Sequence, residues 1–159
     1  MIQLQKIDLS NLWKVVKLTV NKEQESFVAP NDISILEAYA TVASGYTALP
    51  FAIYDDEELV GFVMFGYDTD GDEGSPAIAA GNYCIWRFMI GKDFQGKGYG
   101  KAALKAAIDF VKTGPCGQAE YCWLSYEPEN TVAEALYQSM GFEKNGEICE
   151  GEIVSVLKL

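Results

Sequence analysis

The chain has 159 residues, of which 49% are apolar and 22% charged, with a formal net charge of −11 and no histidine. This length and composition predict one folded domain, residues 1–159, that buries roughly two-thirds of the surface its unfolded chain would expose. The lack of histidine excludes Ser-His and Cys-His nucleophilic pairs and imidazole acid-base chemistry, and the excess of acids argues against nucleic acid as a partner.

Cysteine spacing and hydropathy add three further expectations. The four cysteines show no Cys-x-x-Cys spacing, and without histidine a zinc site would need all four to converge, so no bound metal is expected. The longest apolar stretch, residues 59–65, is far too short to cross a membrane, and the first residues lack the apolar core of a signal peptide. A cytoplasmic protein with no membrane partner is therefore expected.

The first part of the chain predicts a strand and two helices. Residues 2–7 alternate apolar and polar side chains, as in a short strand, and Ser10 is expected to cap a helix. The inner face of that helix would consist of Leu12, Trp13, Val16 and Val20. Ser34 and Glu37 have capping-box spacing, which predicts a second helix that runs to residue 44.

The middle of the chain predicts antiparallel strands. Residues 51–54 and 59–67 are apolar, aromatic-rich runs on either side of an acidic turn, which is typical of a β-hairpin. Residues 68–76, rich in glycine and acids, predict a solvent loop. Residues 82–90 are apolar on both alternating faces apart from Arg87, as expected of a central strand.

The remaining elements alternate between helix and strand. After the glycine-rich residues 95–100, a helical face is expected from Ala103, Leu104, Ala107, Ile108 and Val111. Residues 121–126 predict a strand, Thr131 begins a capping box for a helix that ends at Gly141, and residues 142–159 predict a β-hairpin. The order β-α-α-β-β-β-α-β-α-β indicates one mixed α/β domain.

The segment from Gln95 to Lys101 joins a predicted strand to a predicted helix. Free backbone N–H groups and the helix dipole at such a junction bind phosphate, and glycine allows a ligand to approach the backbone. Five lysines and two aspartates give residues 92–112 a net charge of +3 within this acidic chain. A solvated helix face after a tight turn is the alternative, but the combination favours an anion site.

Two common phosphate motifs do not fit this segment. A Walker loop needs Gly and Ser or Thr where Gln95 and Ala102 stand. A dinucleotide fingerprint that starts at Gly96 or Gly98 lacks its third glycine. Nucleoside triphosphate and dinucleotide ligands are therefore not expected.

The motif Gln95-x-x-Gly98-x-Gly100 follows a strand that ends Arg87-Phe88-Met89-Ile90, and Asn130 and Leu136-Tyr137-x-x-x-Gly141-Phe142 follow downstream. This pattern resembles the GNAT N-acetyltransferase superfamily across the whole chain. The resemblance implies a central mixed, mostly antiparallel sheet flanked by helices, and acetyl-CoA as the donor. It implies cofactor contacts, mostly through the main chain, for Met89, Ile90, Gln95, Gly96, Lys97, Gly98, Tyr99, Gly100, Lys101, Asn130 and Ala133.

The same resemblance places the phenol of Tyr137 beside the sulfur of CoA, where it would protonate the departing thiolate. The alternative is a core aromatic on an amphipathic helix. No cysteine occupies a motif that suggests an acyl-enzyme, so direct attack by the acceptor in a ternary complex is expected.

An alkylammonium acceptor must be bound as a cation and deprotonated before it can attack. No acid lies in residues 82–90, so the carboxylate is expected among Glu23, Glu25, Glu37 and Glu127, each of which also fits an ordinary surface position. Phe27, Tyr83 and Trp86 are candidates for the wall of an amine channel through apolar and cation–π contact, with core packing as the alternative.

Three segments look like bacterial spermine/spermidine acetyltransferases: Gln24-x-x-Phe27-Val28-Ala29, Ser34-x-x-Glu37-Ala38-Tyr39 and the ending Gly146-Glu147 to Gly151-Glu152. Gly91 departs from the pattern, since many such sequences carry Asp there. This second resemblance implies a polyamine acceptor. The superfamily resemblance implies, by analogy, a homodimer, because exposed edge strands commonly pair in that superfamily. Another amine, such as a protein N-terminus, a lysine or an antibiotic, remains an alternative, as does a non-catalytic acyl-CoA sensor.

Overall fold

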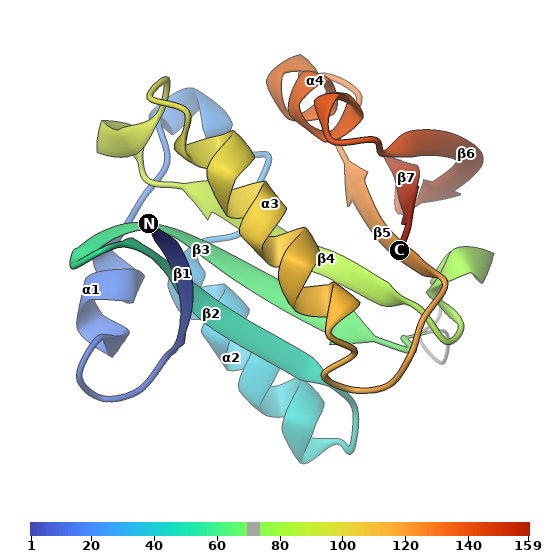
Figure 1. Ribbon diagram of the computed structural model, residues 1–159, viewed down its shortest axis with the longest axis horizontal. Coiled ribbons are helices and arrows are strands. Elements are labelled where there is room, and N and C mark those ends of the chain that lie inside the picture. Colours follow the sequence, from blue (N-terminus) through green and yellow to red (C-terminus); the bar gives the residue numbers. More distant parts are fainter. Residues whose placement is uncertain (70–73) are drawn as a thin grey trace.

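A single mixed sheet organises the computed structural model, which describes residues 1–69 and 74–159 (Figure 1). Its strands are β1 (Ile2–Lys6), β2 (Ala48–Asp55), β3 (Glu58–Tyr67), β4 (Tyr83–Ile90), β5 (Tyr121–Tyr126), β6 (Glu143–Cys149) and β7 (Glu152–Lys158), in the spatial order β1-β2-β3-β4-β5-β7-β6. Neighbours pair antiparallel except β4 and β5, which confirms the predicted mixed, mostly antiparallel sheet. The solvent loop predicted for residues 68–76 lies partly outside the described residues.

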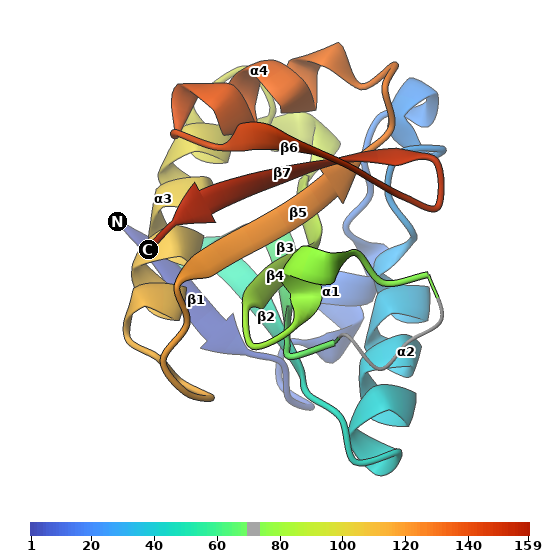
Figure 2. The same cartoon turned by 90° about the vertical axis from the view of Figure 1, so that its right-hand side faces the viewer.

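Helices cover both faces of this sheet (Figures 1 and 2). They are α1 (Leu12–Lys17), α2 (Asn31–Ala43), α3 (Tyr99–Lys112) and α4 (Thr131–Ser139), with short 3-10 turns η1 (Lys22–Gln24), η2 (Ala77–Ala79) and η3 (Lys92–Phe94). Alternate residues of β3 serve opposite layers: Phe65 packs in the cluster under α3, and Phe62 in the cluster under α1 and α2. Both side chains are fully buried, so β3 is the centre of the core.

The helix α3 follows its predicted pattern closely. Its five expected inner residues are all buried: Ala103, Leu104, Ala107, Ile108 and Val111. The residue that precedes the helix, Gly98, has a left-handed φ of 86°, which glycine adopts at little steric cost. The predicted strand, glycine loop and helix unit is thus confirmed.

The prediction for α1 is wrong in its details. Ser10 does not cap the helix, because its hydroxyl donates to Asp8. Val15 is the buried residue, while Trp13, expected to face inward, is 67% exposed. A helix of only six residues has too few turns for its apolar spacing to fix a face, so the packing of Val15 against α2 and β3 decides it.

Two capping boxes were also misplaced. Ser34 lies fully buried inside α2, which begins at Asn31, and Asn31 donates through Nδ2 to the carbonyl of Val15 at 2.9 Å. At α4 the cap is Asn130, whose side chain accepts from the N–H of Ala133 at 3.3 Å. Both helices start earlier than the Ser/Thr-x-x-Glu spacing suggests: α4 is capped by Asn130, whereas α2 has no side-chain cap and Asn31 ties its first turn to α1.

The strands β4 and β5 separate soon after they pair. Their register contains only the pairs Tyr83–Cys122 and Cys84–Trp123 within the described chain, and the strands then diverge (Figure 1). β4 also carries Trp86 as an extra residue opposite β3, a β-bulge of the kind that re-aims neighbouring side chains. The carboxyl ends of the two parallel strands are therefore apart, with an unpaired edge of β4 between them.

Candidate active site

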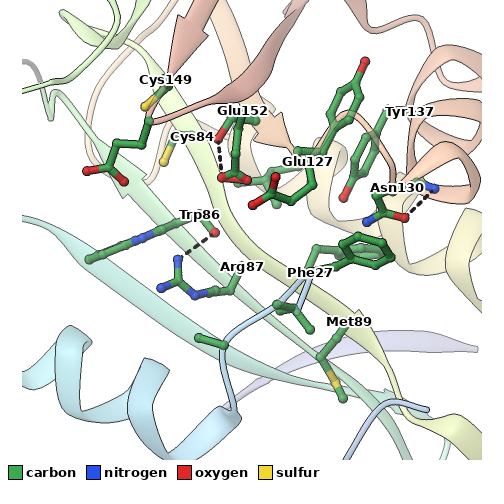
Figure 3. Close-up of a pocket in the computed structure, with 18 of the residues that line it drawn as sticks. Phe27, Cys84, Trp86, Arg87, Met89, Glu127, Asn130, Tyr137, Cys149 and Glu152 are labelled. Carbon is green, nitrogen blue, oxygen red and sulfur yellow. Dashed lines mark hydrogen bonds between the residues drawn. The ribbon is translucent and has the colours of Figure 1, made fainter. Parts of the chain in front are cut away.

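A cleft of about 1060 Å³ lies where β4 and β5 diverge (Figure 3). Residues 84–90 of β4 form its floor, and the opposite wall comes from the end of β5, the start of β7 and helix α4. One end adjoins the glycine loop before α3, and the other carries several carboxylates. We call this cavity the central cleft.

The glycine loop offers unoccupied backbone donors at one end of the central cleft. No intrachain backbone hydrogen bond involves the N–H groups of residues 95–101, within the described part of the chain. A Cβ added at Gly96 or Gly98 would meet no atom within 4 Å, so both backbones border open space. Free N–H groups beside open space at a helix N-terminus have the geometry that binds a pyrophosphate.

The side chain of Gln95 holds this loop in place. Its Nε2 donates to the carbonyl of Ile90 at 3.0 Å and to Oε1 of Gln24 at 2.8 Å. The first bond ties the loop to the end of β4, and the second ties it to η1. The sequence did not indicate the part played by Gln24, because its partner lies 71 residues away.

Several residues of the predicted cofactor set lie beside the central cleft without lining it. The Tyr99 hydroxyl bonds to Oδ2 of Asp55 at 3.2 Å, and Nζ of Lys97 bonds to the carbonyl of Asp93 at 2.7 Å. Lys101 is exposed on the first turn of α3. Such residues can reach a ligand only through their main-chain groups or through the positive potential of the loop.

Tyr137 is both a core aromatic residue and part of the wall of the central cleft. It is 8% exposed and packs against Tyr126 and Phe142, with ring centroids 5.7 and 6.0 Å away, yet it also lines the central cleft. The carbonyl of Tyr137 accepts from the N–H of Phe142 at 3.1 Å, the helix-ending arrangement that the left-handed Gly141 permits. Burial raises the pKa of its phenol, which keeps the proton in place at neutral pH.

Glutamates gather at the opposite end of the central cleft. Glu127 follows β5 and Glu152 begins β7, and Figure 3 shows both side chains projecting into the cavity. Oε1 of Glu152 accepts from the Ser125 hydroxyl at 3.3 Å. Burial raises the pKa of Glu152 and the charge of Glu127 adds to this, while the Ser125 bond and the charge of Arg87 act in the opposite direction.

Arg87 is the one cation among the residues that line the central cleft, within the described ranges 1–69 and 74–159. Its Nη2 lies 3.0 Å from Oε2 of Glu37, and its guanidinium lies 5.5 Å from the centre of the Trp86 ring. Phe27 lines the same part of the cavity. The structure thus brings Phe27, Trp86, Glu37 and Glu127 to one cavity. It adds Arg87, for which the sequence indicated no part in the acceptor site.

Two expectations for the acceptor site are wrong. Tyr83 is fully buried away from the central cleft, where its hydroxyl donates to the carbonyl of Gly117 and accepts from the N–H of Cys116, both at 2.8 Å. It is a core residue, as the alternative had it. Glu23 is exposed on η1 and does not line the cavity.

Glu152 also lines the central cleft, although it is not among the candidate site residues expected from the sequence. The sequence names it only in the ending Gly151-Glu152, without a role, and the pairing of β7 with β5 brings it to the central cleft. At Gly91, the position of the departure, an added Cβ would lie 2.5 Å from Cδ1 of Leu18, a side-chain end that would have to shift. In the described residues no group of three or more Cys, Asp or Glu is arranged to hold a metal ion, and no helix is long and apolar enough to cross a membrane.

Comparison with known proteins identifies a family and relatives that resemble this chain. Residues 14–142 match the model of the acetyltransferase (GNAT) family. The chain is 30% identical to a spermine/spermidine N(1)-acetyltransferase of Bacillus subtilis (strain 168) and 31% identical to a probable spermine N(1)-acetyltransferase of B. subtilis subsp. natto, over 99% of each chain.

Solved structures agree on the fold. An aminoglycoside acetyltransferase, AAC(6')-Ib, in complex with coenzyme A superposes with a TM-score of 0.80 at 16% identity, over 99% of this chain and 95% of that one. A spermidine N-acetyltransferase from Vibrio cholerae, with CoA and spermine, gives 0.67 at 19% identity over 99% and 94%. Divergent parallel strands, a glycine loop before a helix and full-length sequence similarity lead to one conclusion: the chain belongs to the GNAT acetyltransferase family.

Proposed function

We propose that this protein, acting as one domain over residues 1–159, transfers the acetyl group of acetyl-CoA to a primary amine of a polyamine by direct attack in a ternary complex. The observation that supports this most strongly is that the two ends of the central cleft differ: one offers free backbone N–H donors and the other offers glutamates. The names of the full-length relatives at 30–31% identity support a polyamine acceptor.

The donor would be held mainly by the main chain. Residues 95–101 offer N–H groups to the pyrophosphate, and the lysines of α3 add a favourable potential. The edge of β4 at Met89 and Ile90, unpaired on the β5 side, is available to the pantetheine amides in the manner of an added strand. Asn130 and Ala133 line the opposite wall of the same passage.

Tyr137 is the general acid of the proposed transfer. As the acceptor nitrogen bonds to the acetyl carbon and the bond to sulfur breaks, the Tyr137 phenol gives its proton to the sulfur. A phenol whose pKa is raised by burial is fully protonated at neutral pH, which is the state a general acid needs.

The carboxylates match a polycationic acceptor. Glu25, Glu127, Glu150 and Glu152 line the central cleft, whereas the charge of Glu37 is largely offset by Arg87. A polyamine can place its reacting amine near the donor and a remote ammonium among these acids, with Phe27 and Trp86 beside its methylene chain. A monoamine offers only the first of these interactions.

The test is an acetyl-transfer assay on the purified protein with spermidine, spermine, a monoamine of similar length, kanamycin and a lysine peptide. Free CoA thiol and the mass of the product are measured, with both substrates varied. We expect spermidine or spermine to have the highest kcat/KM, with intersecting double-reciprocal lines. A faster reaction with kanamycin or the peptide would assign another acceptor, binding of acetyl-CoA without turnover would indicate a sensor, and parallel lines would indicate an acyl-enzyme.

A further inference from the structure

We propose that Glu152 is the general base that removes a proton from the acceptor ammonium, and that the neighbouring carboxylate of Glu127 assists it. This inference rests on the proposed acetylation of an amine. It assigns a residue at the start of β7 to a task for which β4 carries no carboxylate.

The surroundings of Glu152 fix the carboxylate on the central cleft. Its Oε1 is held by the Ser125 hydroxyl at 3.3 Å, and β5 and β7 pair in register at Tyr126 and Ile153 beside it (Figure 2). Glu127 projects into the same part of the cavity (Figure 3). The base would thus sit at the start of β7, next to the strand β5 whose divergence from β4 creates the cleft.

Two further side chains point to a ligand at this place. Tyr137 is more than nine-tenths buried, lines the central cleft and has no hydrogen bond to its phenol among the described residues. The indole N–H of Trp123, also on the wall of the cleft and 7% exposed, is buried without a partner in the described chain. A buried donor without a partner is costly, and an indole N–H can only donate, which favours an occupant of this cavity that carries a hydrogen-bond acceptor, such as the carbonyl of a thioester.

The other carboxylates of the central cleft fit the task less well. Glu37 is paired with Arg87 at 3.0 Å, so its carboxylate already has a cationic partner within the chain. Glu25 and Glu150 are exposed, whereas Glu152 is partly buried and accepts a hydrogen bond from Ser125.

Glu152 combines the features that a carboxylate base requires. The groups that face it are Glu127 after β5, Arg87 on β4, Glu150 in the preceding turn and Tyr137 on α4. Burial and the charge of Glu127 raise the pKa of Glu152 against the opposing effects of Arg87 and Ser125. A raised pKa makes its carboxylate a stronger base than an ordinary glutamate.

The proton balance of the transfer is complete with these residues. An N–H bond of the acceptor ammonium breaks, and its proton moves to the Glu152 carboxylate. The free amine then forms the C–N bond as the C–S bond breaks, and Tyr137 protonates the sulfur. The nitrogen returns its second excess proton to the Tyr137 phenolate, and Glu152 releases its proton to water. One proton is liberated for each amide formed.

The experiment compares Glu152→Gln with wild type on two kinds of acceptor. Spermidine is cationic at neutral pH, whereas 2,2,2-trifluoroethylamine is a weakly basic amine that is already neutral there. We expect kcat/KM for spermidine to fall by about 10²–10⁴-fold, the usual loss of a general base. The loss of kcat/KM with 2,2,2-trifluoroethylamine should be far smaller, because this neutral amine needs no initial deprotonation.

Two companion variants complete the design. Glu127→Gln should move the acidic limb of the kcat/KM profile to lower pH, because removal of a neighbouring negative charge lowers the pKa of Glu152. Glu129→Gln, an exposed carboxylate two residues away that does not line the central cleft, should leave activity and pH profile unchanged. CoA affinity and thermal unfolding of each variant report whether the fold is intact.

Equal loss on both amines in a folded Glu152→Gln protein would overturn the base assignment, as would unchanged activity. An unshifted acidic limb in Glu127→Gln would overturn the role of Glu127. Wild-type protein that acetylates no amine at all would instead refute the proposed function, so the two failures are distinct.

Discussion

The two ends of the central cleft are built in different ways. The glycine-loop end comes from one continuous segment, residues 95–101, and offers main-chain N–H groups. The acidic end is assembled from side chains on α2, β4, β5 and β7, of which Glu37, Arg87 and Glu152 are examples. A backbone site is a local property of the chain, whereas a side-chain site of this kind exists only after the sheet has formed.

The largest expected effect is at the loop end. Gly98→Glu places a side chain on a residue with φ of 86° and a negative charge where we expect a pyrophosphate. Like charges in contact cost several kcal/mol, so CoA affinity should fall by about 10³-fold or more in calorimetry.

Gly146→Glu is the matched control for this variant. Gly146 also has a left-handed φ, 88°, with open space at its Cβ, but it lies on β6 and does not line the central cleft. It should carry similar backbone strain and bind CoA normally. Equal loss of affinity in both variants would mean that strain, not the anion site, is responsible.

The next effect tests Tyr137, which lies between the two ends. Tyr137→Phe removes one hydroxyl and keeps the ring that packs on Tyr126 and Phe142. Turnover should fall by about 10²–10⁴-fold while CoA affinity is retained. Tyr67→Phe, which alters another partly buried tyrosine outside the central cleft, should remain fully active. A fully active Tyr137→Phe enzyme would reduce Tyr137 to a packing residue.

A smaller effect concerns the acidic end alone. Each exposed ion pair with a remote ammonium is worth up to about 1 kcal/mol, or roughly fivefold in affinity, and salt screens it. The advantage of spermidine over a monoamine in kcat/KM should therefore shrink as salt is raised, with the monoamine little affected. A preference that does not respond to salt would show that the glutamates do not select the acceptor.

The smallest effect is on stability. Asn130→Ala removes the cap that accepts from the Ala133 N–H and should cost about 1 kcal/mol, seen as a lower Tm of the ligand-free protein. Asn130→Asp keeps an acceptor oxygen at the same place and should melt close to wild type. Equal melting of the Ala variant and wild type would show that the α4 cap contributes nothing.

The contrast between local features and features assembled by the sheet explains what the sequence predicts well. The inner face of α3, with Leu104 and Ile108, follows from apolar spacing over a long helix, and the glycine loop follows from residues adjacent in the chain. The family resemblance extends this to the mixed, mostly antiparallel sheet. These features depend on neighbours in sequence, which is why they can be predicted without a structure.

The predictions that were wrong depend on contacts between residues far apart in the sequence. The burial of Ser34 and of Val15 depends on how α1 and α2 pack on the sheet, and the Tyr83 hydroxyl reaches the carbonyl of Gly117 because β4 begins at Tyr83, next to that loop. The approach of Glu152 to Glu127 depends on the insertion of β7 between β5 and β6. No local spacing encodes such contacts, so the acidic end was predicted only in part.

The most direct test of the two-ended cleft is an NMR titration of backbone amides, with CoA used so that no transfer occurs. CoA should shift the amides of residues 95–101, and spermidine added to the CoA complex should then shift those at Ser125, Glu127 and Glu152. We expect two separate sets of shifted amides, one for CoA and one for spermidine. Spermidine shifts confined to the loop, or none around Glu127 and Glu152, would contradict it.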